Sequence, residues 1–277
     1  MSSLHVPLSE IRDVVMDLAK EAGQIILSAN PSEFDNKKNT VDIVTETDKA
    51  VESLISSALK AKYPSFKFIG EETYTPGTTI TDDPTFIVDP IDGTSNFVHG
   101  FPAVCVSIGL VVEKQPTIGI VYNPFLDELY TAVKGSGAFV HHGSKSQKLP
   151  LRNSPLRGLG PACIGIEWGS DREGVNFELN LKVFTTLART KATGGRIAAG
   201  QQDMFWECGC WAWDVAAAWC ILNEAGGMIV DGHPGNWYPP IDNRRYLAVR
   251  AAPAGQKEIV EQFWGIIGED RSTYGPS

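Results

Sequence analysis

The feature of the sequence that most constrains the fold is the run FIVDPIDGT at positions 86–94, where an apolar stretch leads directly into two aspartates. The apolar part is typical of a buried strand, because β-branched and aromatic residues favour strands. Pro90 cannot donate to a sheet, so we expect the chain to leave the sheet there and to present Asp89 at the strand end. The turn at Gly93 can point backbone N–H groups outward, as a phosphate cradle requires. Asp89 and Asp92 would repel a phosphate, so the pattern predicts a hard cation such as Mg²⁺ between them.

Each aspartate also has a simpler interpretation when it is taken alone. Asp89 would then only end a strand, and Asp92 would form an Asx-turn before Gly93. The complete run is much more specific than either part.

Length and charge limit the class of protein. The chain has 277 residues, and 33 acidic against 24 basic side chains give a formal charge of −9. We expect a single domain over residues 1–277, with approximate halves 1–150 (α+β) and 151–277 (α/β). The acidic balance argues against nucleic acid and anionic membranes as partners, since both bind clustered Lys and Arg.

The cysteines and the chain start favour a cytoplasmic location. Five cysteines form an odd set in a chain that is long enough to fold without disulfides. The first residues contain no basic segment followed by an apolar one, as a signal peptide would have. The most apolar long segment, 211–230, contains Asp214 and Glu224, so we expect no membrane span.

Hydrophobic periodicity predicts the other elements. In the first half we expect a helix capped by Ser9, a helix over 47–62, strands at 66–69 and 85–88, and a mostly antiparallel sheet formed by runs at 103–112, 117–122 and 129–133 and continuing to Val140. In the second half we expect strands at 162–167, 228–230 and 246–250 and helices at 176–189, 214–225 and 256–267.

Four segments together resemble the inositol monophosphatase family. They are DPIDGTSNF at 89–97, VTETD at 44–48, FIGEE at 68–72 and WDVAA at 213–217, in the order in which the family has them. The resemblance covers most of the chain, and the segment at 198–215 is most similar to the fungal branch. It implies an α+β fold of the sugar and inositol phosphatase type, a layered αβαβα sandwich.

The resemblance also implies a site. Two or three Mg²⁺ ions would be held by Glu71, Asp89, the carbonyl of Ile91, Asp92 and Asp214. Catalysis would involve Asp48, Thr94 and Glu71, with Asp48 and Thr94 orienting the attacking water. The substrate would contact Gly93, Thr94, Glu207 and Asp214. Hydrolysis would then be direct, with no phosphoenzyme and no cysteine or histidine nucleophile. We expect a surface or packing role for His99, the histidine nearest the motif.

The activity implied is Mg²⁺-dependent hydrolysis of a small-molecule phosphate monoester, myo-inositol 1-phosphate first, by a lithium-sensitive homodimer. Glu207 matches a carboxylate that accepts hydrogen bonds from ring hydroxyls, which suits a cyclic polyol. Similar proteins act on histidinol phosphate, fructose 1,6-bisphosphate or phosphoadenosine phosphates, and some fungal relatives are tied to quinate use, so these substrates stay open.

One segment departs from the family pattern. The family has a strand and a helix where this chain has only residues 190–199. Loss of a helix would expose several hundred Å² of apolar surface, at a cost of several kcal/mol at about 25 cal/mol per Å². A second hypothesis is therefore a non-catalytic or impaired relative that keeps the fold.

Overall fold

The computed structural model describes residues 7–29, 35–36, 43–44, 46–190 and 202–276. Their contacts divide the chain into two compact units. The first unit contains Met1–Gln147 and Ala212–Ile221, and the second contains Lys148–Trp211 and Leu222–Ser277. The assignment of residues 1–277 to a single domain stays a prediction.

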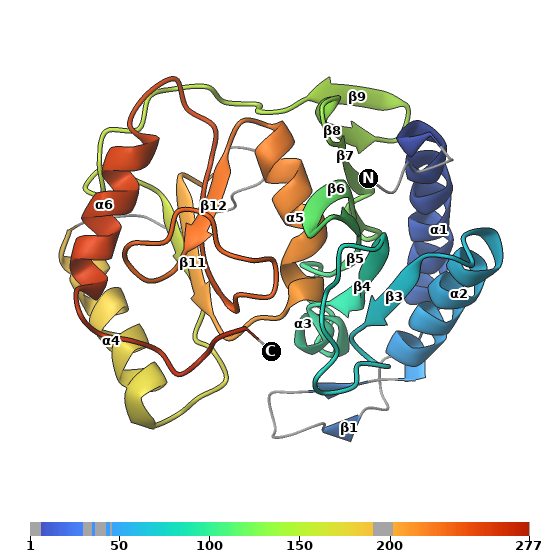
Figure 1. The fold of residues 1–277 in the computed structure, drawn as a ribbon, viewed down its shortest axis with the longest axis horizontal. Coiled ribbons are helices and arrows are strands. Elements are labelled where there is room, and N and C mark those ends of the chain that lie inside the picture. Colours follow the sequence, from blue (N-terminus) through green and yellow to red (C-terminus); the bar gives the residue numbers. More distant parts are fainter. Residues whose placement is uncertain (1–6, 30–34, 37–42, 45, 191–201, 277) are drawn as a thin grey trace. The chain divides into compact units, whose positions relative to one another are not determined.

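The first unit is built on a mixed sheet of seven strands in the order β3-β4-β5-β6-β7-β8-β9 (Figure 1). The strands are β3 (Lys67–Gly70), β4 (Thr85–Asp92), β5 (Cys105–Val112), β6 (Gln115–Asn123), β7 (Glu128–Val133), β8 (Gly137–His142) and β9 (Lys145–Lys148). Strands β3 and β4 are parallel, whereas the pairs from β4 to β8 are antiparallel. A short antiparallel pair, β1 (Asp35–Asn36) with β2 (Ile43–Val44), belongs to the same unit.

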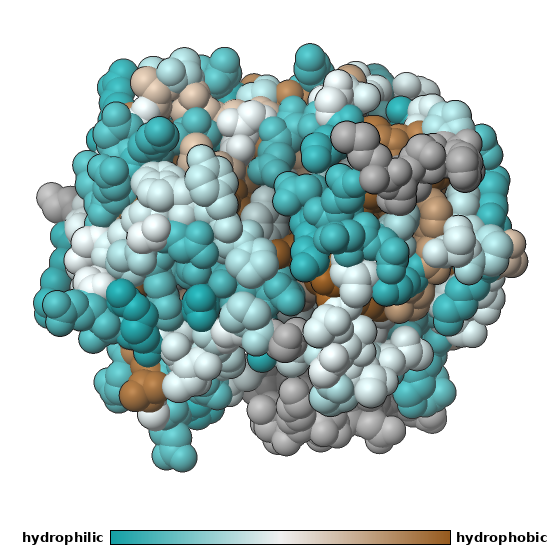
Figure 2. All heavy atoms as spheres, viewed as in Figure 1, coloured by the Kyte–Doolittle hydropathy of each residue, from teal (hydrophilic) through white to brown (hydrophobic). Residues whose placement is uncertain are grey.

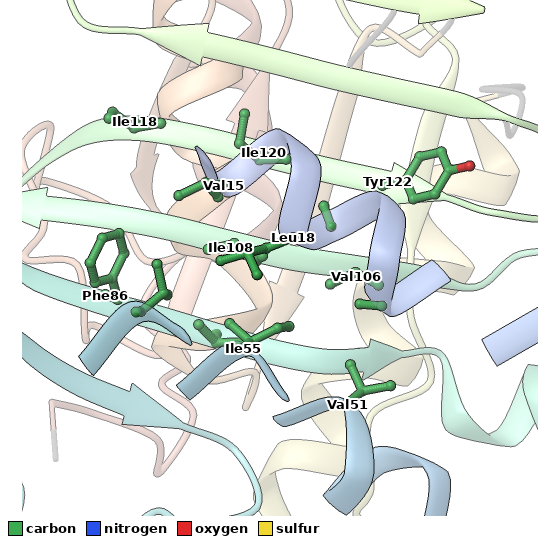
Figure 3. Packing of buried hydrophobic residues seen from close by; sticks show 14 of the residues in the cluster. Val15, Leu18, Val51, Ile55, Phe86, Val106, Ile108, Ile118, Ile120 and Tyr122 are labelled. Atoms are coloured by element: carbon green, nitrogen blue, oxygen red, sulfur yellow. The ribbon is translucent and has the colours of Figure 1, made fainter. Parts of the chain in front are cut away.

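Two helices, α1 (Leu8–Ser28) and α2 (Glu46–Lys62), cover one face of this sheet (Figure 1). Their apolar faces bury side chains against the central strands; those labelled in Figure 3 are Val15 and Leu18 of α1, Val51 and Ile55 of α2, Phe86 of β4, Val106 and Ile108 of β5, and Ile118, Ile120 and Tyr122 of β6. The predicted helix over 47–62 is confirmed. The predicted cap at Ser9 is wrong, because Pro7 precedes the helix and Ser9 lies inside it. Among the residues that the structure describes, no side chain caps the first turn of α1.

Helix α5 (Ala212–Glu224) packs on the same sheet through small residues. A Cβ at Gly109 would lie 2.9 Å from the Ala216 Cβ, and one at Gly119 would lie 2.2 Å from the Ala217 carbonyl oxygen. Glycine on the strands and alanine on the helix therefore allow the backbones to approach closely. This approach brings the first turn of α5 to the sheet.

The second unit has a four-stranded mixed sheet in the order β10-β11-β13-β12. Its elements are β10 (Ile164–Ile166), β11 (Met204–Cys208), β12 (Met228–Asp231), β13 (Arg245–Val249), α4 (Gly174–Arg189) and α6 (Gln256–Ile267). Helices α4 and α6 pack against each other in the apolar core of this unit. The short helix α3 (Thr94–Val98) belongs to the first unit. Strand β10 is parallel to β11, and the other pairs are antiparallel.

The helices and strands expected for the second half are present within a few residues, and α6 has the predicted bounds. Strand β11 was not predicted, although it is paired on both sides. Of the shortened segment 190–199, only Thr190 lies within the described residues, where it caps α4.

No helix within the described ranges is both long and apolar enough to cross a membrane. Hydrophilic residues predominate on the face shown in Figure 2.

Candidate active site

The acidic end of β4 stays in the sheet longer than its sequence suggests. The expectation that Pro90 forces the chain out of the sheet is wrong, because β4 continues to Asp92. An irregularity in register between Asp89 and Asp92 accommodates the proline, with Asp89 opposite Ser107 and Asp92 opposite Cys105. Both aspartates therefore have fixed places at one end of the strand.

Asp89 is buried at that end, with 3% of its surface exposed, whereas Asp92 is exposed. The backbone N–H of Ile91 donates a hydrogen bond of 3.0 Å to Asp89 Oδ1, so the side chain is oriented by its own strand. Asp92 Oδ2 accepts a hydrogen bond of 3.5 Å from the Cys105 thiol. Burial, followed by the charges of Asp92 and Asp89, raises the pKa of that thiol well above its usual value, so Cys105 acts as a donor.

The turn after β4 requires a glycine. Gly93 has φ of 89°, and a Cβ there would lie 2.7 Å from the Ala103 carbonyl oxygen. The same carbonyl accepts a hydrogen bond of 2.9 Å from the Asn96 side chain. The turn is thus closed around one carbonyl group, which holds Thr94 at the start of α3.

The side chains of Thr94 and Asp48 are in contact. The Thr94 hydroxyl lies 3.1 Å from Asp48 Oδ1 and 3.0 Å from the Ile91 carbonyl oxygen. Asp48 is fully buried in the first turn of α2. Since a hydroxyl has one proton, it donates to one of these acceptors at a time, and its oxygen can accept a hydrogen bond from a further molecule.

Glu71 follows β3, whose carboxyl end lies beside that of β4 because the two strands are parallel. The Glu71 backbone N–H donates to the Val88 carbonyl at 3.1 Å. The side chains of Glu71 and Asp89 share a hydrogen bond. Parallel pairing therefore brings together acids that are eighteen positions apart in the chain.

Asp214 reaches the same group from the first turn of α5. The buried Ser107 of β5 donates a hydrogen bond of 3.1 Å to the carbonyl of Trp213, the residue before Asp214. Trp213 also packs against Tyr74, with ring centroids 5.0 Å apart. The start of α5 is thus held by the sheet and by a loop of the same unit.

The electrostatic result is concentrated on Asp89. Its burial, the charges of Glu71, Asp92 and Asp214, and its hydrogen bond with Glu71 hold the pKa of Asp89 well above its usual value. A carboxylic acid in such surroundings is stabilised in its neutral form unless a cation balances the charge. Four converging carboxylates form an oxygen-donor set suited to Mg²⁺ and similar hard cations.

The carboxylates are the right kind of ligand for a hard cation, but their side chains are not yet arranged around a common point. Among the described residues, no three His, Cys, Asp or Glu side chains are arranged so that they could hold a metal ion as they stand. Asp89 and Glu71 are instead hydrogen-bonded to each other. A cation that replaced the shared proton would be held by these same carboxylate oxygens.

Two further residues were singled out in the sequence. Glu207 is in β11 of the second unit, opposite Tyr246 of β13. Its role in binding substrate stays a prediction. His99 is exposed, and its Nδ1 lies 2.7 Å from the Ser95 carbonyl oxygen within α3, a local contact.

Sequence reasoning missed three residues that support the acids: Ser107, Cys105 and Glu52. Ser107 and Cys105 lie two positions apart on β5, opposite Asp89 and Asp92 of β4. Only the register of the two antiparallel strands shows this pairing, and the sequence does not contain it. Glu52 had a possible signal, because it stands four residues after Asp48 at a buried position of α2.

The comparisons with known proteins agree on one family. A sequence profile described as the inositol monophosphatase family matches residues 7–267. Inositol monophosphatase 2 of Saccharomyces cerevisiae is 43% identical over 287 residues, which cover 95% of this chain and 97% of that protein. The resemblance to the fungal branch is thereby confirmed.

Solved structures show the same fold. Inositol monophosphatase from Anabaena (Nostoc) sp. PCC 7120 matches with a TM-score of 0.75 and 26% identity, covering 96% of this chain and 98% of that one. A staphylococcal inositol monophosphatase-1, in a LiCl-soaked inhibitory complex, matches with a TM-score of 0.78 and 20% identity over 96% and 97% of the two chains. The predicted α+β fold class of this type, with two mixed sheets flanked by helices, is confirmed.

Proposed function

Because the chain belongs to the inositol monophosphatase family, we propose that it hydrolyses the phosphate monoester of a cyclic polyol, with myo-inositol 1-phosphate as first candidate. The products are the polyol and inorganic phosphate. The observation that carries this proposal is the convergence of Glu71, Asp92 and Asp214 on the buried Asp89.

The proposal assigns two or three Mg²⁺ ions to this group. Their ligands would be the four carboxylates and the carbonyl oxygen of Ile91, which lies between Asp89 and Asp92. When bound, such ions supply Lewis acidity, which neutralises phosphate charge and makes a water molecule a better nucleophile at neutral pH.

The chain's own residues orient the reactants. The Thr94 hydroxyl donates to Asp48 and so directs its free lone pairs outward, where they can accept a hydrogen bond from the attacking water and orient it. Asp48, buried and fixed on α2, holds that orientation. Positioning of this kind contributes several kcal/mol to a hydrolysis, since the water no longer loses its freedom in the transition state.

Substrate contacts belong to the same proposal. Gly93 and Thr94 would meet the phosphate at the turn, and Glu207 would accept hydrogen bonds from ring hydroxyls. Histidinol phosphate, fructose 1,6-bisphosphate, phosphoadenosine phosphates and a quinate-related ester are tested as competing substrates.

We also propose that the protein is inhibited by lithium, forms a homodimer and is located in the cytoplasm. A staphylococcal relative of the same fold is described in a LiCl-soaked inhibitory complex. A small cation that competes for the carboxylates around Asp89 would produce the same inhibition here.

The test is phosphate release from myo-inositol 1-phosphate by the purified protein, with and without Mg²⁺, alongside a thermal melt. We expect release that depends on Mg²⁺ and is lost in Asp92→Asn but kept in Asp82→Asn, a control at an exposed aspartate in the loop before β4. A protein that melts cooperatively and releases no phosphate from any of these esters would overturn the proposal and favour the non-catalytic relative.

A further inference from the structure

Helix α2 buries a second carboxylate one turn after Asp48. Glu52 is 1% exposed, and Asp48 is fully buried. Positions i and i+4 lie on the same side of a helix, so both carboxylates point from α2 toward the region of β3 and β4 that α2 contacts. A buried carboxylate is costly, so its contacts indicate its use.

One oxygen of Glu52 holds the turn that carries Glu71. Glu52 Oε2 accepts a hydrogen bond of 2.8 Å from the backbone N–H of Glu72. The preceding N–H, that of Glu71, donates to the Val88 carbonyl of β4. Two consecutive N–H groups are therefore fixed, one by the sheet and one by α2, and the Glu71 side chain projects from between them.

Gly70 is shaped to the same carboxylate. A Cβ on Gly70 would lie 2.4 Å from both Cδ and Oε2 of Glu52. Gly70 lies outside the left-handed region, so this position requires a glycine for space and not for conformation. The carboxylate of Glu52 thus packs flat against the backbone at the end of β3.

The second oxygen of Glu52 is not used in a hydrogen bond within the part of the chain that the structure describes. Oε1 is buried and has no hydrogen-bond partner among the described residues. An unsatisfied buried acceptor is destabilising, and a glutamate chosen only to stabilise α2 would avoid it. The retained interaction is the one with Glu72, which points to a role in placing the turn.

We propose that Glu52 is a positioning residue of the acidic site: it fixes the turn Gly70–Glu72 so that Glu71 is presented to Asp89. The inference rests on the proposed function, since it assumes that the carboxylates around Asp89 bind a divalent cation. In this arrangement α2 sets the place of both Asp48 and Glu71, and so couples the water-orienting pair to the cation site.

The test measures binding of Mn²⁺ alone to metal-free protein by calorimetry, together with kcat and KM for the phosphate ester. Glu52→Ala removes the acceptor, and we expect Mn²⁺ to bind about tenfold more weakly, the equivalent of one hydrogen bond to a charged group. Glu52→Gln keeps an acceptor for the Glu72 N–H, and we expect binding within about threefold of wild type. The metal concentration needed for half-maximal kcat should rise most in Glu52→Ala and less in Glu52→Gln. The KM for the ester should change little in either variant.

The control is Ile55→Val on the same helix, which loosens packing in the core shown in Figure 3 without touching the turn. We expect a lower melting temperature and unchanged Mn²⁺ affinity. Wild-type affinity in Glu52→Ala would overturn the inference, and so would equal losses in Glu52→Ala and Glu52→Gln, because the charge and not the hydrogen bond would then matter.

A second variant keeps the test decisive if Glu52→Ala does not fold. Gly70→Ala adds a Cβ that would meet the Glu52 carboxylate, so we expect it to displace that carboxylate and to weaken Mn²⁺ binding while Glu52 itself is unchanged. Unchanged binding in Gly70→Ala would contradict the inference. A wild-type protein that binds no Mn²⁺ and releases no phosphate would instead overturn the proposed function.

Discussion

Buried acids of the second unit are paired with arginines, whereas Asp89 of the first unit lies among other acids. In the second unit, Asp203 Oδ1 accepts hydrogen bonds of 2.7 Å from both Arg152 and Arg250. Asp231 forms a two-pronged pair with Arg245, each contact being 3.1 Å long. A buried carboxylate with a guanidinium partner is a structural element of its unit.

In the first unit, neither Asp89 nor Glu52 forms an ion pair with any Lys, Arg or His within the described part of the chain. Asp89 is surrounded instead by three further carboxylates, and its burial, followed by their charges, raises its pKa. The difference teaches that burial of an acid alone does not indicate function. An acid whose neighbours carry the same charge indicates a site that receives its positive charge from outside the chain.

The largest expected effect is on turnover, when Asp89 of the first unit is replaced. Asp89→Asn should lower turnover at least about a thousandfold, because loss of cation binding removes several kcal/mol of transition-state stabilisation. Its melting temperature without metal should be equal to or above that of wild type, since one member of a repelling group is removed. Steady-state kinetics and a metal-free melt check both parts, and a marked loss of metal-free stability would assign Asp89 to the fold instead.

In the second unit we expect Asp203→Asn to lower the stability of the fold, in contrast to Asp89→Asn. This change leaves Arg250, which is 1% exposed, without its counter-charge. We expect a loss of about 3–5 kcal/mol in the free energy of unfolding, measured by urea titration. Asp270→Asn is the matched control, because its pair with Lys182 is exposed and should be worth at most about 1 kcal/mol. Equal effects of the two changes would contradict the comparison.

A smaller effect should follow from Ser107→Ala. The variant removes the hydrogen bond to the Trp213 carbonyl and should cost about 1 kcal/mol of stability. It should also weaken Mg²⁺ binding several-fold, since the first turn of α5 carries Asp214. Ser56→Ala, which removes only a local contact to the Ser53 carbonyl within α2, should leave Mg²⁺ binding unchanged. Calorimetry that finds wild-type affinity in Ser107→Ala would remove Ser107 from the support of the site.

The last expected effect is a pH dependence and concerns His233, beside Asp231, which pairs with Arg245. Burial, followed by the charge of Arg245, lowers the pKa of His233 to about 4, and its Nε2 accepts a hydrogen bond of 3.1 Å from the Ser272 N–H. The unfolded chain, in which histidine titrates near about pH 6.5, binds more protons than the folded chain below that pH, so stability falls as the pH drops toward about 4.

His233→Gln removes this proton uptake, so the stability of the variant should decline less between about pH 6.5 and about pH 4. Urea midpoints across that interval test the expectation. Parallel declines for variant and wild type would mean that His233 does not contribute to acid sensitivity.

The sequence predicted the fold best where periodicity was strong and local. Helix α6 has the predicted bounds because its apolar spacing is regular, and the parallel strands before Glu71 and Asp89 were found from their apolar runs. Strand β11 was missed because MFWEC is short, and its pairing with β10 and β13, which are distant in the chain, establishes it.

The acids of the candidate site were predictable, but their supports were not. Asp89 and Asp92 lie in a specific motif, whereas Glu52 is recognised only through its contact with Glu72, twenty positions later. Pro90 misled the prediction because a local rule about sheet donors gave no information on the bulge that accommodates it. Tertiary contacts, absent from local patterns, decide such positions.

The central claim is that the carboxylates around Asp89 form a divalent-cation site. The most direct measurement is the melting temperature of metal-free protein during a Mg²⁺ titration, for wild type and for Asp89→Asn. The account predicts a rise that saturates with Mg²⁺ in wild type and is absent in the variant, because a ligand that binds only the folded state stabilises it. A wild-type melting temperature that does not change with Mg²⁺, or an equal rise in Asp89→Asn, would contradict it.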